Sequence, residues 1–309
     1  MIKYLFDWRV GLTLLCLLLL ACVPLFASGF YLGVLTIAFY MAVYAMNWDL
    51  LFGYIDEVNF GPTFLIGLGA YAAGLCNSDL GLPVWVCIII GIGAAMIGGL
   101  ALAGPALRLK GPYFGLVTFV AVLILSNLIT IFAGTTGGDV GLTLNDILTV
   151  SSIGNFYYAL GLVVVTALVL RAIVRSHFGL ILQAIGQDNI VTASLGFDVA
   201  KFKVFAFLVS SFFSGLAGAM TAFYFGAASP GTVVDIAVAV QIIIATLVGG
   251  RRSIIGSILG AIFLVGATEI LRPVGQLSTT IVAAIGLLVL LFVPGGFIGA
   301  FGAHRGRKA

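Results

Sequence analysis

The chain has 309 residues, of which 62% are hydrophobic and 8% are charged, and its formal net charge is +3. Soluble domains carry roughly 25% charged residues, so the composition excludes an ordinary soluble protein and predicts an integral membrane protein. The basic residues form no stripe along any one segment, which argues against a nucleic-acid partner. We therefore expect one all-α membrane domain that comprises residues 1–309.

The first apolar segment follows Lys3 and Arg9, an arrangement typical of a secretory signal. The sequence Leu-Leu-Ala-Cys at 19–22 also resembles a lipoprotein cleavage site. The apolar run continues beyond Cys22, however, and further apolar segments follow it. We therefore expect an uncleaved first helix.

Apolar segments long enough to cross a bilayer recur along the whole chain, since a span needs about 20 residues. We expect ten spans, near residues 10–28, 30–47, 60–76, 83–104, 112–133, 155–175, 202–226, 234–250, 254–271 and 277–294. If the first span starts in the cytoplasm, all of the 14 Lys and Arg residues except Arg272 lie on the cytoplasmic side. This agrees with the positive-inside rule and predicts a multi-pass protein with both termini in the cytoplasm.

Acidic residues gather at the inner end of the second predicted span. Asp49, Asp56 and Glu57 follow its apolar core within a few residues. Carboxylates at the end of a span commonly lie at the membrane interface, where water solvates them. We expect that position for all three.

The longest extracytoplasmic connection is predicted at residues 134–153, which are rich in Gly, Thr and Asp. Two interpretations remain open for it: a surface that receives a substrate-delivery protein, or a turn-rich connector. A second outer turn is expected at Pro230 and Gly231, before Asp235.

The most polar stretch, residues 176–203, lies between cationic residues and is predicted to be cytoplasmic. Asp188 can cap the N-terminus of a short helix, and Gly196 can end it with a positive φ. Val191 and Leu195, four residues apart, then share one apolar face. Such a helix suits docking on a partner, although an ordinary loop with one helical turn remains the alternative.

Small residues recur at four-residue spacing in the predicted spans, as at Ser214 and Gly218 and at Gly256 and Gly260. Such pairs let helix backbones approach closely in lipid. We expect close helix packing at these positions.

Four polar residues in the last third of the chain are candidates for a translocation path or an ion pair. Glu269 and Arg272 are three residues apart and can pair on one helical face. Their place near the outer end of a span favours a plain interfacial ion pair over a substrate site. Gln241 and Thr246 lie within the preceding span and are candidates for lining a path.

Several motifs in order resemble one family. They are RSHFGLILQAIGQDNIVTASLGFDVAKFKVFAFLVSSFFSGLAGAM at 175–220, LKGPYFGLVTF at 109–119, LVGGRRSIIGSILGA at 247–261 and LFVPGGFIG at 291–299. The chain is identified from them as similar to permease subunits of branched-chain amino acid ABC importers, of the LivM/LivH type. It departs from the family pattern at Ala193 and Ser194, where a glutamate is usual.

The resemblance implies a bundle of about ten helices with an inverted repeat of about five per half, in a bacterial inner membrane. It implies three kinds of partner: a second permease subunit, more often a similar chain than a second copy; cytoplasmic ABC ATPase subunits; and a periplasmic substrate-binding protein. Asp188, Val191, Leu195 and Gly196 would then form the ATPase-coupling helix. The cargo would be branched-chain or related small amino acids, although relatives carry urea or short amides.

Other function classes fit the residues less well. No Gly-x-x-x-x-Gly-Lys-Ser/Thr phosphate loop is present, so ATP must be handled by another subunit. An ion-coupled secondary transporter would carry charges near the membrane midplane, whereas most charges here lie at span ends. The only histidines, His177 and His304, lie outside the spans and cannot activate a buried serine. We expect no enzyme activity, no cofactor and no metal site, since the four cysteines lack metal-ligand spacing.

Overall fold

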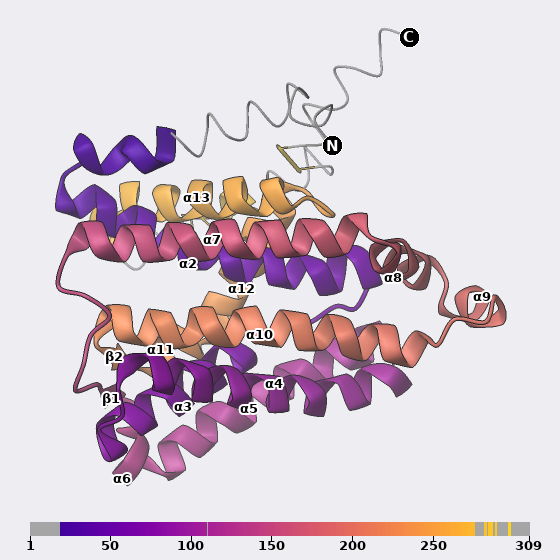
Figure 1. The fold of residues 1–309 in the computed structure, drawn as a ribbon, viewed down its shortest axis with the longest axis horizontal. Helices are drawn as coiled ribbons and strands as arrows, with labels where there is room; N and C mark the ends of the chain where they lie inside the picture. Colours follow the sequence, from indigo (N-terminus) through magenta and orange to yellow (C-terminus); the bar gives the residue numbers. More distant parts are fainter. Residues whose placement is uncertain are drawn as a thin grey trace, which may run out of the picture.

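The computed structural model describes residues 19–109 and 111–275, together with short pieces between 281 and 297, and it is built almost entirely of helices (Figure 1). The long helices are α2 (Gly29–Asp49), α3 (Pro62–Leu80), α4 (Val84–Arg108), α5 (Pro112–Ile131), α7 (Ser152–Arg175), α10 (Val199–Phe225), α12 (Ile236–Gly249) and α13 (Ile254–Ile270). The short elements are η2 (Val23–Leu25), the π-helical turn η3 (Leu50–Tyr54), α6 (Ala133–Thr136), α8 (His177–Gln187), α9 (Asn189–Ser194), α11 (Pro230–Val233) and η4 (Arg272–Val274). One antiparallel pair joins β1 (Leu142–Thr143) to β2 (Ala227–Ala228).

Each predicted span between residues 30 and 271 falls on one helix, with ends that shift by only a few residues. Within the described residues, six helices are long and apolar enough to cross a membrane: Gly29–Tyr54, Val84–Pro105, Pro112–Ile131, Ser152–Arg175, Val199–Phe225 and Pro230–Gly249. Helix α13 is apolar but shorter, and α3 is not among the six. Residues 10–18 of the first predicted span, and most of the predicted span at 277–294, lie outside the described residues. The chain is therefore an all-α, multi-pass membrane protein.

The helices pack as two groups, and each group contains one long helix from the other half of the chain. Helix α10 packs mainly against α3 and α4, whereas α2 packs mainly against α13, α7 and α12. Figure 1 shows α7, α2 and α13 in an upper layer and α10, α3, α4 and α5 in a lower one. The bundle is thus held by long helices that reach across to elements distant in sequence.

Glycine positions explain how closely these helices approach. A Cβ added at Gly260 would overlap the carbonyl oxygen of Ala245, and one at Gly218 would overlap that of Ile66. The backbones of α12 and α13, and of α3 and α10, are therefore in direct contact. The close packing expected at the four-residue small pairs is confirmed at these positions.

The loop at 134–153 is fastened to the end of α3 through Asn77, which is fully buried. Its Oδ1 accepts the backbone N–H groups of Asn145 and Asp146 at 2.9 and 3.0 Å, and its Nδ2 donates to the Asp146 carboxylate at 2.8 Å. The β1–β2 pair places Leu142 opposite Ala228 and so joins the loop to the end of α10. Residues 142–146 are therefore an ordered part of the bundle.

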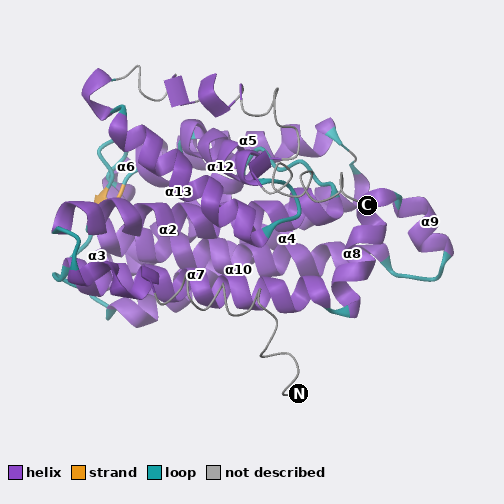
Figure 2. Cartoon of the chain, turned by 90° about the horizontal axis from the view of Figure 1, so that it is seen from above, coloured by secondary structure: helices purple, strands orange, loops and turns teal. Residues whose placement is uncertain are grey.

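At the other end, α8 and α9 extend beyond the long helices (Figures 1 and 2). Figure 2 shows α9 as the part of the chain that projects farthest on that side, whereas α6 and the strand pair lie at the opposite end. We call the end formed by η3, α8, α9 and the turn at 250–253 the α9 end.

Candidate functional site

Helix α8 is the element by which the polar stretch rests on the bundle. Its buried side is formed by Gly179, Leu182 and Ile185. A Cβ added at Gly186 would overlap the carbonyl oxygen of Tyr54, which places α8 directly against η3. The sequence analysis expected a loop with one short helix here and missed α8, although the spacing of Leu182 and Ile185 is typical of an amphipathic helix.

Aromatic packing joins α8 to the start of α10. The ring of Phe178 lies 5.3 Å from that of Phe202 and 5.2 Å from that of Phe205, measured between centroids. Aromatic pairs at such separations add to the packing energy. We therefore expect a displacement of α8 to displace the first two turns of α10 as well.

Helix α9 follows as a capped unit. The Asp188 carboxylate accepts the backbone N–H groups of Ile190 and Val191 at 2.7 and 3.1 Å, and Gly196 has a φ of +91°. The predicted cap and stop are confirmed. Val191 and Leu195 are 55% and 70% exposed, so α9 presents apolar side chains to its surroundings.

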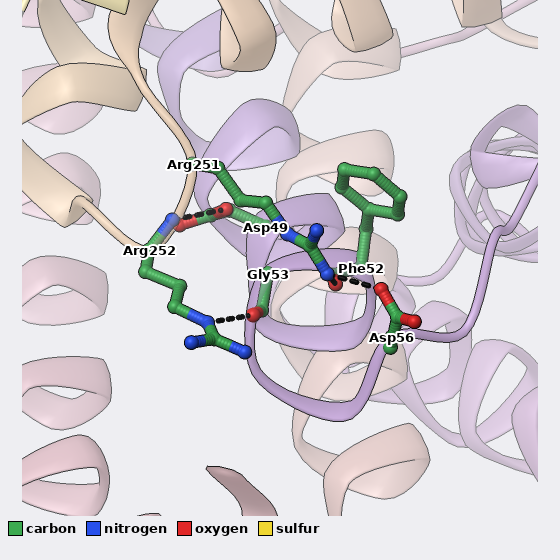
Figure 3. A network of polar contacts seen from close by, with 6 residues as sticks. All are labelled: Asp49, Phe52, Gly53, Asp56, Arg251 and Arg252. Atoms are coloured by element: carbon green, nitrogen blue, oxygen red, sulfur yellow. Dashed lines mark hydrogen bonds and ion pairs between the residues drawn. The ribbon is translucent and has the colours of Figure 1, made fainter. Parts of the chain in front are cut away.

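A buried carboxylate joins α2 to the turn before α13 (Figure 3). Asp49, only 1% exposed, accepts the backbone N–H of Arg252 with one oxygen and that of Ser253 with the other, each at 3.0 Å. Free N–H groups and the dipole at a helix start favour a negative charge. The Tyr54 hydroxyl donates to the carbonyl oxygen of Arg252 at 3.0 Å and closes the same turn.

The side chains of the two arginines in this turn contact the backbone of η3. Arg251 forms an ion pair with Asp56, donates to the carbonyl oxygen of Phe52 at 3.0 Å and places its guanidinium 4.4 Å from the centre of the Phe52 ring. Arg252 donates from Nε to the carbonyl oxygen of Gly53 at 2.6 Å (Figure 3). Asp56 and Arg252 have φ angles of 64° and 62°, a conformation that non-glycine residues rarely adopt. The ion pair of Asp56 with Arg251, and the hydrogen bonds of Arg252 to Asp49 and Gly53, hold both residues in this conformation.

A second buried charge joins the connection after η3 to α10. Lys203 Nζ lies 2.5 Å from Glu57 Oε1, and the two side chains are 4% and 5% exposed. Burial raises the pKa of Glu57, and the hydrogen bond from Lys203 opposes that shift. Trp48 donates from its indole N–H to the carbonyl oxygen of Asn59 at 2.6 Å and fixes the same connection.

These positions correct one expectation from the sequence. Asp49 and Glu57 are buried inside the protein, not exposed at an interface, whereas the side chain of Asp56 is 53% exposed. The buried carboxylates are stabilised because partners about 150 to 200 residues away supply N–H groups and an ammonium group. No local pattern marks those partners, so the sequence analysis could not assign them.

The candidate path residues are spread over α12, α13 and η4. Arg272 and Glu269 form an ion pair of 2.9 Å near the end of α13 that lies away from α9. Thr246 is fully buried and donates to the carbonyl oxygens of Ala45 and Ile242 at 3.1 and 2.9 Å. Gln241 is partly buried one turn earlier on α12. The structure does not bring these four side chains together in one site.

The residues considered for catalysis or metal binding are placed as follows in the part of the chain that the structure describes. His177 is exposed at the start of α8. No group of three or more His, Cys, Asp and Glu side chains is arranged to hold a metal ion there. At the α9 end, the contacts described above connect α8 to η3 and α10, and η3 to the turn before α13.

Comparison with known proteins gives a consistent result. Residues 30–294 match the family described as branched-chain amino acid transport system / permease component. The chain is 26% identical to the high-affinity branched-chain amino acid transport system permease protein LivM of Escherichia coli K12, over 93% of this chain and 74% of that protein. It is 25% identical to LivM of Salmonella typhimurium LT2, with the same coverage.

Proposed function

This chain belongs to the branched-chain amino acid transport permease family, and we propose that it is the membrane subunit of an ABC importer for branched-chain amino acids. The family is one of transport permeases, not of enzymes. ABC importers of this family work with ATPase and other subunits. The observation that carries the proposal is α9: a capped helix that projects from a membrane bundle and exposes an apolar face.

The apolar face of α9 is proposed to dock in a groove of a cytoplasmic ABC ATPase. Val191 and Leu195 would enter that groove, in the helix-in-groove mode of recognition. Exposed apolar side chains on the membrane spans are explained by lipid. Those of α9 lie on a projecting connection, and a protein partner accounts for them better.

Force would pass from α9 through α8 into the bundle. Helix α8 rests on η3 and contacts α10 through Phe178. The buried pair of Glu57 and Lys203 then links α10 to the connection between α2 and α3. When ATP binding closes the ATPases, α9 and α8 would move together and shift α10 relative to α2, which would change the side to which the bundle opens.

The proposed topology has ten spans, cytoplasmic termini and an inverted repeat. Partly reciprocal packing supports the repeat: α10 packs against α3 and α4, and α2 packs against α13, less extensively against α12, and also against α7. An inverted repeat that exchanges α2 with α10 would produce this pattern. In this topology residues 1–309 form a single domain, with the α9 end in the cytoplasm and residues 134–153 outside.

The remaining proposed partners are a second permease subunit and a periplasmic substrate-binding protein. For the permease subunit, a similar but different chain is favoured over a second copy of this one. The ordered outer loop is the proposed receiving surface for the binding protein. Val140 and Val150, 90% and 89% exposed, would provide its apolar contacts.

The coupling proposal is tested with Leu195→Asp and Val191→Asp in the full chain, reconstituted with the ATPases and binding protein encoded by neighbouring reading frames. Burying a leucine contributes about 1.5–3 kcal/mol, so we expect coupling to weaken about tenfold or more. Leucine uptake and substrate-stimulated ATP hydrolysis should fall together, and the ATPase should be easier to strip from the membrane.

Ala193→Glu is the matched control, because it adds a carboxylate to α9 without removing Val191 or Leu195, near the place where the family usually has a glutamate. It should leave uptake within about twofold of the unmodified chain, since exposed substitutions usually change free energies by less than about 0.5 kcal/mol. Normal assembly and uptake with Leu195→Asp would show that α9 is only a connector. Uptake of urea or short amides in place of leucine would change the assigned cargo.

Topology is tested separately with reporter fusions. Fusions after Lys110, Arg252 and Ala309 should report the cytoplasm, and a fusion after Asp146 should report the outside. Reporters at 110 and 146 on the same side of the membrane would contradict the ten-span topology.

A further inference from the structure

A pocket of about 190 Å³ lies between the middle of α5 and the start of α12. On α5 it is lined by Val122, Leu123 and Ser126, and on the other side by Val234, Asp235 and Ile236. Most of these side chains are aliphatic. The polar side chains among them are the hydroxyl of Ser126 and the carboxylate of Asp235. The coupling account does not use this pocket.

The carboxylate of Asp235 is held in a fixed position. Its Oδ1 accepts the backbone N–H of Ala237 at 2.9 Å, as the cap of α12. Its own backbone N–H donates to the carbonyl oxygen of Pro230 at 2.9 Å, which anchors it to α11. Among the described residues, Asp235 forms no ion pair, so its negative charge has no protein counter-charge there.

This lining matches one kind of ligand. A fixed carboxylate beside a hydroxyl binds a primary ammonium group through charge-assisted hydrogen bonds. Val122, Leu123, Val234 and Ile236 match a branched aliphatic body. Urea and short amides carry no positive charge and have little apolar surface, so they would gain little from either feature.

We propose that this pocket is a substrate site midway along the bundle, in which Asp235 and Ser126 bind the ammonium group of the transported amino acid. The inference rests on the proposed function and deepens it, because it selects amino acids over neutral amides. Substrate released by a binding protein would be held here before it passes inward.

The same ammonium chemistry is present in a lipid headgroup, phosphatidylethanolamine. The two sources are separated by the choice of bilayer, since phosphatidylcholine has no primary ammonium. Binding of free leucine to the full chain in phosphatidylcholine nanodiscs that persists when phosphatidylethanolamine is added assigns the pocket to the transported amino acid.

The experiment compares Asp235→Asn with the unmodified full chain in these nanodiscs, using radiolabelled leucine and its analogue without the amino group, 4-methylpentanoate. Asparagine caps helices as well as aspartate does, so the variant loses the charge and keeps the start of α12; thermal unfolding verifies this. We expect leucine to bind the variant at least about tenfold more weakly. The analogue should bind the unmodified chain no better than leucine binds the variant. Asp79→Asn, an exposed outer carboxylate on α3, is the matched control and should bind leucine normally.

Equal leucine affinity in Asp235→Asn and the unmodified chain would overturn the assignment, as would the absence of saturable leucine binding to the unmodified chain. Loss of leucine binding when phosphatidylethanolamine is added would assign the pocket to lipid and overturn it too. Cellular uptake of leucine separates the two proposals. If uptake requires this chain but is insensitive to Asp235→Asn, the permease function survives and only the pocket assignment fails.

Discussion

Two ion pairs of similar chemistry lie toward opposite ends of the molecule and differ in burial. Glu57 and Lys203, 2.5 Å apart near the α9 end, have side chains that are 5% and 4% exposed. Glu269 and Arg272, 2.9 Å apart near the far end of α13, have side chains that are 28% and 71% exposed. The exposed pair is three residues apart and visible in the sequence, whereas the buried pair joins positions 146 residues apart.

The ion pair that the sequence predicts, Glu269 with Arg272, therefore contributes less to the structure than the buried pair. An exposed ion pair contributes about 0–1 kcal/mol, because water already solvates both charges. A buried pair gains little net energy as a whole, but removal of one partner leaves a charge without compensation. The buried pair therefore fixes how α10 sits against the connection between α2 and α3, and the exposed pair fixes little.

The largest effect is expected for Lys203→Met, which leaves the Glu57 carboxylate buried without its ammonium partner. The free energy of unfolding should fall by about 3–5 kcal/mol, measured by denaturation of the full chain in detergent. The double variant Glu57→Gln/Lys203→Met removes both charges and should recover a large part of the loss. A double variant as unstable as the sum of both single variants would show that the two residues act independently.

An intermediate effect is expected for Asp49→Ala. This change removes the acceptors of the Arg252 and Ser253 backbone N–H groups, and a buried donor without a partner costs about 1–3 kcal/mol. Asp49→Asn keeps one acceptor oxygen and should lose less, and thermal unfolding of the three proteins should rank them in that order. If alanine and asparagine variants unfold at the unmodified temperature, Asp49 does not hold the turn before α13.

The smallest effect is expected for Glu269→Gln, which breaks the exposed pair. The free energy of unfolding should change by less than about 1 kcal/mol, and leucine uptake should stay close to that of the unmodified chain. The small change should shrink further at high salt, because salt screens exposed charges. A strong loss of uptake with normal stability would instead place Glu269 on the translocation path.

The sequence by itself determined the class of protein, the places of the long apolar helices and the local capping. Composition and apolar runs are enough for the first two, because a bilayer requires long apolar helices whatever they contact. Asp188 and Gly196 were assigned correctly since a cap involves residues only two or three positions apart. The pairing of Glu269 with Arg272 is local in the same sense.

Only the tertiary structure decided which helix faces meet. In lipid, one apolar face resembles another, so the sequence period does not show that α8 rests on η3 or that α2 packs on α13. The same holds for Asp49 and Glu57, whose partners come from the turn at 250–253 and from α10. The pocket at Asp235 also exists only because α5 lies beside the start of α12. The position of a helix depends on residues close to it in the chain. The partners of a buried charge and the walls of a pocket depend on residues that are distant in the chain and come together only in the folded protein.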